Sequence, residues 1–361
     1  MNVNLNEYFK LGLDSTNNPT IQAGLINTIR TPSDTSSQSA NRISFKVPKI
    51  GMLTADSHIN LRFTTSGATN VQLNLINGAL GCVKRMRILL GNKVLTDVER
   101  PGLHSIPHLY SRNTLQQLAD YYREFIGCNY VLKTRLDDGT NILDRDINVG
   151  MNDDGDYYTK NSQINQTRSR TYALPLKLLG ADFLSNASLP VFLLQEKEMI
   201  IELEFDPVSN NWCFEPNGTL VAGKSVFVDI DKCELVSTHI QIPDEVELQQ
   251  LDAIKSRPAQ YPLLDVYSIK AVIPAGADGV ANSNLYRLNV QNREVHKLLM
   301  VLRPLDNTDT QIMANQCSLG GDISIQMKVN GLNYFEKTLT NSAVQYQVLK
   351  DYLDGLSLKF P

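Results

Sequence analysis

Alternation of apolar and polar residues predicts β-strands along most of the chain. The pattern is clear at 59–63, 201–205 and 226–230, where every second residue is apolar. A period of two places successive side chains on opposite faces of a sheet, so these segments are expected to be half-buried antiparallel strands. A denser apolar run at 298–302 is typical of a strand that is covered on both faces.

Helical periodicity occurs in few places. The best example lies at 111–126, where one face carries Leu115, Leu118, Ala119, Tyr122 and Ile126. Gly127 is suited to end this helix, since glycine readily adopts the left-handed conformation of a C-terminal cap. A second short helix is expected at 244–255, because it follows Pro243 and stops before Pro258. We interpret it as the link between two domains.

The order strand, turn, strand, helix occurs twice. In the first half a hairpin around Gly91-Asn92 precedes the helix at 111–126, and in the second half a hairpin around Asn330-Gly331 precedes a helical stretch at 342–353. This repeat predicts two β-sandwiches side by side. After its helix the first copy continues through expected strands at 174–179, 191–205 and 226–236. The second copy has no such set before Pro361.

Composition and charge narrow the function. The chain has 361 residues, 42% of them hydrophobic, which is typical of a folded protein with room for two cores. A net charge of −4 disfavours nucleic acid as a partner, because neutralising phosphates requires a surplus of Lys and Arg. Residues 1–42 are rich in Asn, Ser and Thr and are expected to form an N-terminal arm. No signal-peptide pattern and no run of about 18 apolar residues is present.

Motifs for catalysis, metal binding or cofactor binding are missing from the sequence. The histidines show neither HExxH nor HxH spacing, and no GxSxG or glycine-rich phosphate loop occurs. The cysteines show no CxxC spacing and predict buried, inert thiols in a reducing compartment; they are Cys82, Cys128, Cys213, Cys233 and Cys317. We therefore expect no enzyme activity, no catalytic or metal-binding residues and no cofactor.

Two features invite a binding role. The acidic stretch 137–156 has the composition of a calcium loop, but its spacing differs from that of an EF-hand, and a solvated surface loop is favoured. Trp212 offers an aromatic ring for stacking on a sugar, although an aromatic residue at a strand end more often fills a core.

Several short motifs together resemble one protein family. They are Leu-Pro-Leu-Lys-Leu-Leu at 174–179, Leu-Pro-Val-Phe-Leu-Leu at 189–194 and Glu-Met-Ile-Ile-Glu-Leu-Glu-Phe at 198–205. In this order they resemble the end of the first jelly roll in double jelly-roll major capsid proteins of double-stranded DNA viruses. Residues 77–88 are similar to the smaller-virus branch, and residues 325–331 resemble the second jelly roll's strand and hairpin. Lys177-Leu-Leu179 replaces the aromatic residues of the large nucleocytoplasmic viruses, which favours a virophage-like or polinton-like origin.

The resemblance implies an all-β fold of two tandem antiparallel jelly rolls with a few short inserted helices. The expected organisation is an arm at 1–42, a first jelly roll at 43–240, a helical linker at 241–258 and a second jelly roll at 259–361. A major capsid protein of this kind forms homotrimers, and these pseudo-hexagonal capsomers tile an icosahedral shell with their strands upright. Its implied location is the virion capsid, assembled inside the host cell.

The resemblance also implies partners. They are further copies of the chain, minor capsid proteins, penton proteins and, through the N-terminal arm, an internal membrane, with no sequence-specific nucleic acid. The alternatives are a jelly-roll protein that binds carbohydrate or a receptor, and an enzyme with two carboxylates about 5 to 9.5 Å apart in a cleft. Because the second copy lacks its closing strands, we expect the natural chain to extend about 80 to 150 residues beyond Pro361, or a neighbouring chain to donate strands.

Overall fold

A computed structural model gives the fold. It describes residues 25–34, 41–66, 70–73, 78–103, 123–126, 132–137, 142–147, 163–165, 170–179, 188–194, 197–207, 212–214, 225–256, 285–288, 326–329 and 331–333.

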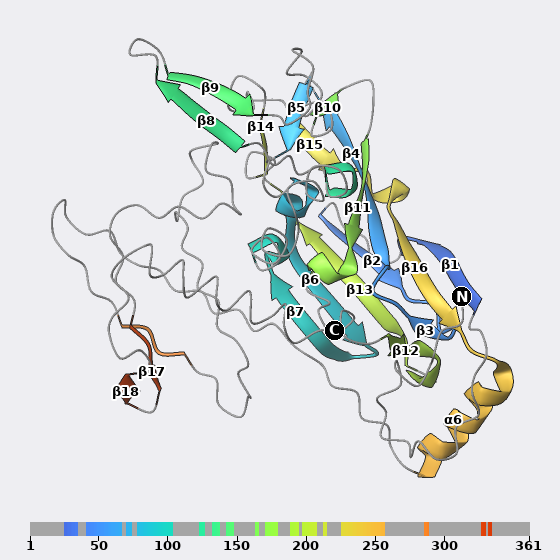
Figure 1. Ribbon diagram of the computed structural model, residues 1–361. Helices are drawn as coiled ribbons and strands as arrows, with labels where there is room; N and C mark the ends of the chain where they lie inside the picture. Colours follow the sequence, from blue (N-terminus) through green and yellow to red (C-terminus); the bar gives the residue numbers. More distant parts are fainter. Residues whose placement is uncertain are drawn as a thin grey trace.

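Strands dominate the described residues (Figure 1). They are β1 (Leu25–Pro32), β2 (Arg42–Lys46), β3 (Met52–Leu53), β4 (His58–Ser66), β5 (Asn70–Leu73), β6 (Val83–Leu90), β7 (Lys93–Glu99), β8 (Leu132–Asp137), β9 (Ile142–Ile147), β10 (Gln163–Asn165), β11 (Arg170–Pro175), β12 (Leu189–Pro190), β13 (Met199–Phe205), β14 (Cys213–Phe214), β15 (Ser225–Val228), β16 (Glu234–Gln241), β17 (Lys328–Val329) and β18 (Leu332–Asn333). The helices are α4 (Arg123–Ile126) and α6 (Asp244–Ser256), with 3-10 helices η2 (Gly78–Cys82), η4 (Leu176–Leu179), η6 (Val191–Leu194) and η8 (Ile230–Lys232).

The main strands pair like one long hairpin folded over on itself. β1 pairs with β16 and β2 pairs with β13, so early strands meet late ones. Further in, β4 pairs with β11 and β3 pairs with β12. At the centre, β6 pairs with β7 across the turn at Gly91, whose φ of 58° is one that glycine adopts without strain. All of these pairs are antiparallel.

The folded hairpin makes two sheets. The larger sheet has four strand positions, and three of them are each shared by two short strands that follow one another along the same line. The order is β1, then β15 and β16, then β3 and β4, then β11 and β12. Strands share a position because both β15 and β16 pair with β4, and both β3 and β4 pair with β16. The smaller sheet has the order β2-β13-β6-β7. Among the described residues of these two sheets, strand positions that follow one another along the chain alternate between the larger and the smaller sheet. The exception is the β6–β7 hairpin, whose two strands both lie in the smaller sheet. This strand order is that of a jelly roll, and it confirms the predicted all-β fold.

The jelly roll begins earlier than the sequence indicates. Residues 1–42 are predicted as an arm, but Leu25–Pro32 forms the edge strand β1. Its side chains are largely exposed, with Leu25 at 64% and Ile26 at 53%. Pairing with β16 along its whole length therefore holds β1, and a pattern of apolar burial does not reveal such a strand. The predicted boundaries at 240 and 258 stay predictions.

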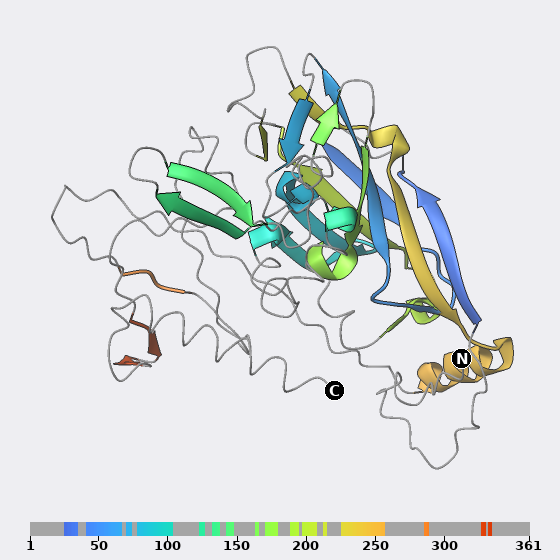
Figure 2. The same ribbon diagram turned by 45° about the horizontal axis from the view of Figure 1, so that its top comes forward.

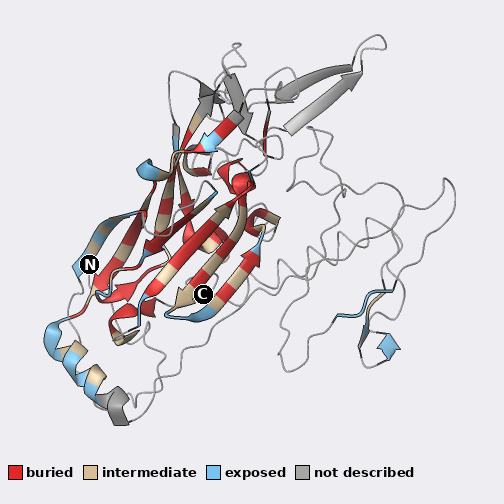
Figure 3. Ribbon diagram, turned by 180° about the vertical axis from the view of Figure 1, so that it is seen from behind, coloured by how far each residue is buried: buried red, intermediate tan, exposed pale blue. Residues whose placement is uncertain are grey.

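The facing sides of the two sheets form one core, which Figure 3 shows as buried residues on the facing strands. Alternate residues such as Ile59, Leu61 and Phe63 on β4 are fully buried. Each such side chain contributes about 1.5–3 kcal/mol relative to an exposed one. The ring centroid of Phe63 lies 5.6 Å from those of Tyr172 and Trp212, in edge-on and tilted arrangements that aromatic pairs favour.

A smaller apolar cluster lies near the end of the sandwich where α6 begins. Its buried members are Met52, Phe192, Ile240 and Ile242, and Leu193 and Val246 pack against them. In both views α6 extends beyond this end of the strands (Figure 1 and Figure 2). The helix was predicted at 244–255, and its presence is confirmed.

Two expected strand segments are 3-10 helices instead. Residues 176–179 form η4 and residues 191–194 form η6, each directly after a proline that ends a strand. Proline has no N–H to donate to a sheet ladder, so the strand stops there. Leu176, Leu178 and Leu179 remain buried. Apolar content therefore indicated the burial correctly and the secondary structure wrongly.

The acidic stretch also differs from its prediction. Residues 142–147, expected in a surface loop, form β9 and pair with β8. The two strands pair antiparallel, with Leu132 opposite Ile147 and Asp137 opposite Ile142. Residues 138–141 and 148–156 lie outside the described residues.

The remaining sequence predictions are described only in part. The final turn of the helix expected at 111–126 is α4, and residues 111–122 lie outside the described residues. The hairpin around Asn330-Gly331 is confirmed as β17 and β18. The strand at 298–302, the helical stretch at 342–353 and most of the predicted second jelly roll also lie outside the described residues.

A further small sheet lies at the end of the sandwich away from α6, where β5 pairs with β10 and β14 (Figure 1).

Gly51 joins three elements beside the smaller cluster. Its φ is +54°, and a Cβ at this position would lie 2.2 Å from the carbonyl oxygen of Ile240. Its own carbonyl accepts a hydrogen bond of 3.3 Å from the N–H of Phe192, and its backbone also bonds to Glu247 of α6. A side chain here would clash with β16 and disturb the bonds that Gly51 makes to η6 and α6.

Substituting Gly51 tests this contact. We expect Gly51→Ala to lower the free energy of unfolding by more than about 2 kcal/mol, the sum of left-handed strain and overpacking. Gly91→Ala is the matched control, because Gly91 has a similar φ of +58° but nothing within 4 Å of its Cβ position. It should cost only the strain, about 1 kcal/mol. Equal losses in urea unfolding would contradict the close contact.

Candidate functional site

Side chains that carry catalytic or metal chemistry do not gather in the described part of the chain. It contains no group of three or more His, Cys, Asp or Glu residues arranged to hold a metal ion. His58 stands near the carbonyl of Asp56, and His239 is buried in the sandwich. His104, His108 and His296 lie outside the described residues. None of the described helices has the length and apolar character needed to cross a membrane.

The described cysteines are buried thiols that form no disulfide, as the sequence predicts. They are Cys82, Cys213 and Cys233. Burial raises the pKa of all three thiols, to about 11 for Cys233. A thiol with a raised pKa is not ionised near neutral pH and is a poor nucleophile. Cys128 and Cys317 lie outside the described residues.

Trp212 fills the core, as the favoured interpretation predicts. Its side chain is only 2% exposed, and its indole N–H donates a hydrogen bond of 3.3 Å to the carbonyl of Asp206. A ring in this position is not available to stack on a sugar.

His239 and Glu247 both contact the backbone at residues 50–51. The His239 ring is fully buried, with Nε2 2.9 Å from the hydroxyl of Ser237. Burial lowers the pKa of His239, and a hydrogen bond with the backbone of Ile50 partly offsets this effect. Burial and the nearby Asp244 raise the pKa of Glu247. At this end of the sandwich both charged forms are therefore less stable than they are in water.

The most distinctive surface is the outward face of the sheet β2-β13-β6-β7. The inward positions of these strands, such as Phe45, Ile201 and Ile88, lie in the core. The outward positions carry charges whose sign alternates from strand to strand. They are Arg42 and Lys46 on β2, Glu202 and Glu204 on β13, Arg85 and Arg87 on β6, and Asp97 and Glu99 on β7. We call these outward positions, with Ser44, Ile200, Leu89 and Val94, the striped face.

The register of the strands arranges the striped face in three rows. The first row reads Arg42, Glu204, Arg85, Glu99. The second row reads Ser44, Glu202, Arg87, Asp97. The third row reads Lys46, Ile200, Leu89, Val94 and is mostly apolar. Basic and acidic strands thus alternate across the face.

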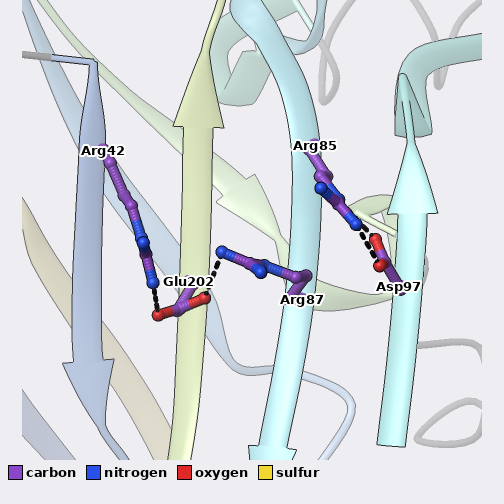
Figure 4. Close-up of polar contacts among 5 residues, drawn as sticks. All are labelled: Arg42, Arg85, Arg87, Asp97 and Glu202. Atoms are coloured by element: carbon purple, nitrogen blue, oxygen red, sulfur yellow. Dashed lines mark hydrogen bonds and ion pairs between the residues drawn. The ribbon is translucent and has the colours of Figure 1, made fainter. Parts of the chain in front are cut away.

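Ion pairs join neighbouring strands of the striped face (Figure 4). Glu202 contacts both Arg42 and Arg87, with an N–O distance of 2.9 Å to Arg87. Arg85 donates two hydrogen bonds to Asp97, one of 2.7 Å from its Nε, and this bonding raises the pKa of Arg85. Although Glu202 points outward, its side chain is only 8% exposed, because the two arginines flank it.

A register shift adds one more charge to this surface. The shift falls between Glu204 and Phe205 of β13. Lys84 on the neighbouring strand β6 donates a hydrogen bond of 2.7 Å to Glu204. The alternation of charge within each strand is visible in the sequence, for example at Glu202 and Glu204. Which strands are neighbours is not, so sequence analysis missed the striped face.

The comparisons with known proteins were made by sequence and by structure. No protein-family model matches the chain, and no curated protein is similar to it in sequence. Among solved structures, the Faustovirus major capsid protein is 11% identical, with a TM-score of 0.43 over 70% of this chain and 59% of that one.

Two further structures are similar. PBCV-1 VP54, fitted into a reconstruction of the virophage Sputnik, is 12% identical with a TM-score of 0.36, over 66% of this chain and 47% of that one. The mavirus major capsid protein is 11% identical with a TM-score of 0.31, over 66% and 52%. The chain thus spans about half the length of these two structures. The structures named here are viral capsid proteins, the class that the sequence motifs resemble.

The buried imidazole of His239 predicts a pH dependence of stability. The folded state holds the pKa of His239 below its ordinary 6.5. Above pH 6.5 the imidazole is neutral in both the folded and the unfolded state, so it does not change the free energy of unfolding. As the pH falls below 6.5, the unfolded chain takes up the proton first. Stability is therefore lost on acidification. We expect His239→Gln to show a smaller drop in urea midpoint between about pH 7.5 and about pH 5.5 than the natural chain. Equal drops in both proteins would rule out this contribution.

Proposed function

We propose that the chain is a subunit of a viral major capsid protein, and that it forms homotrimeric capsomers in an icosahedral shell. The observation that carries the proposal is where the resembling motifs lie. Residues 174–179 span the end of β11 and η4, residues 189–194 span β12 and η6, and residues 198–205 include β13. These elements belong to both sheets and close the jelly roll, which is the role that the resemblance implies for them.

The surface supports a structural role. Most charges of the striped face already form ion pairs, and the described thiols and Trp212 are buried. A closed ring of three subunits requires heterologous contacts between unlike surfaces, of about 2,000 Å² or more for an obligate assembly. In this proposal the protein is located in the virion and assembles inside the host cell. Its partners are further copies, minor capsid proteins and penton proteins, and the segment before β1 reaches an internal membrane.

Sedimentation and electron microscopy test the proposal. The intact chain has a mass of 40.3 kDa, and we expect a particle of three times that mass that persists on dilution to about nanomolar concentration. Negative-stain images should show hexagonal outlines. A folded sample that is monomeric throughout would contradict the capsid function.

A further inference from the structure

The striped face has a charge pattern that fits a second copy of itself. We propose that two copies of this chain pair through their striped faces, across a two-fold axis parallel to the strands. This inference rests on the proposed capsid function only for its place in a shell. The pairing itself follows from the order of charges across the sheet.

Symmetry decides how two striped faces can pair. From one edge to the other the face reads basic, acidic, basic, acidic, on β2, β13, β6 and β7. A two-fold axis parallel to the strands brings a second copy opposite in reversed order, so β2 faces β7 and β13 faces β6. Every basic strand then lies opposite an acidic one. An in-plane axis perpendicular to the strands would place each strand opposite its own copy, with like charges facing.

The same axis matches the rows. Rotation about it keeps each row opposite the same row, so Arg85 faces Glu204 of the second copy and Arg42 faces Glu99. In the third row Ile200 faces Leu89 of the second copy. Val94, which is 47% exposed, faces the aliphatic stem of Lys46. The apolar row is thereby covered at the same time as the charges are complemented.

The groups needed for this contact are accessible. The side chains of Arg85, Asp97 and Lys46 are 42%, 36% and 53% exposed. Most charges of the striped face already form ion pairs within one copy, and Glu99 faces Arg42 of the second copy. Bringing the faces together therefore adds attraction without burying an unpaired ion. Such complementarity contributes orientation and association rate more than affinity.

The size of the face implies weak pairing. Strands about 4.8 Å apart that rise about 3.4 Å per residue make a face roughly 15–20 Å on a side. Its area of about 200–400 Å² is well below the roughly 800 Å² per partner of a standard interface. A weak contact is suited to joining neighbouring capsomers, where many copies act together. If the strands stand upright in the shell, a two-fold axis parallel to them is perpendicular to the shell surface, as axes between capsomers must be.

A charge exchange tests the contact while keeping the ion pair within each copy. In Arg85→Asp with Asp97→Arg, the pair survives in reversed order. The new carboxylate at position 85 then faces Glu204 of the second copy, and the new guanidinium at position 97 faces Ser44, between Arg42 and Lys46 of the second copy. We expect the association constant, measured by sedimentation velocity of the intact chain, to fall about tenfold or more. The matched control exchanges the ion pair on the other sheet, Arg30→Glu with Glu234→Arg, and should associate normally.

Salt and mixing give two further readouts. Association of the natural chain should weaken between about 0.01 M and about 1 M NaCl, as the Debye length falls from about 30 Å to about 3 Å. A second variant, Glu204→Arg, should also fail to pair with itself, because the guanidinium at position 204 then faces Arg85 of the second copy. It should pair with the first variant, because the guanidinium at position 204 then faces the carboxylate at position 85 and Arg85 faces Glu204. Circular dichroism checks that each variant folds, and if the second does not, the first variant and its control decide.

Three results would overturn the inference. They are pairing of the first variant as tightly as the natural chain, association that salt leaves unchanged, and absence of pairing at low salt. Trimer formation is measured separately, at high dilution. Trimers with an unaffected variant would overturn only the paired faces, whereas salt-sensitive pairs without trimers would overturn only the capsid function.

Discussion

Main-chain pairing between strands that are far apart in the sequence holds this fold together. β16 is central, because it pairs with β1 on one side and with β3 and β4 on the other. Without it the larger sheet would separate into the isolated strand β1, the pair β3–β12 and a group around β4. The smaller sheet depends in the same way on β13, which pairs with both β2 and β6. Each of these two strands satisfies backbone groups on both of its edges.

The two faces of the smaller sheet show how one set of strands serves two purposes. Inward residues such as Leu203 and Met86 are fully buried and contribute to folding. Outward residues between them, such as Glu202 and Arg87, carry the charges of the striped face. A period of two separates the two sets completely, so the outward pattern can change without altering the core.

The sequence predicted the elements whose signal is local. Strands β4, β6, β7 and β13 show alternation, Gly91-Asn92 marks a turn, and Pro243 marks the start of α6. It failed for three features, of which two depend on which strands are neighbours. β1 buries few side chains, so only its pairing with β16 identifies it as a strand. Residues 176–179 are as apolar as a buried strand, yet the proline before them ends the sheet ladder. The striped face depends on which strands are neighbours, and that information is tertiary.

Pairing of early strands with late ones also affects how the chain is made. Asn27 bonds to Gln241, which is 214 residues further along. At about 5–20 residues per second, a ribosome needs roughly 10–40 s to reach Gln241 after it has made Asn27. During that time β1 has no strand to pair with, and its apolar side chains are open to other chains. The central strand of the larger sheet is the last of its strands to be synthesised. Until β16 has emerged, β1 of a nascent chain is therefore an unpaired strand.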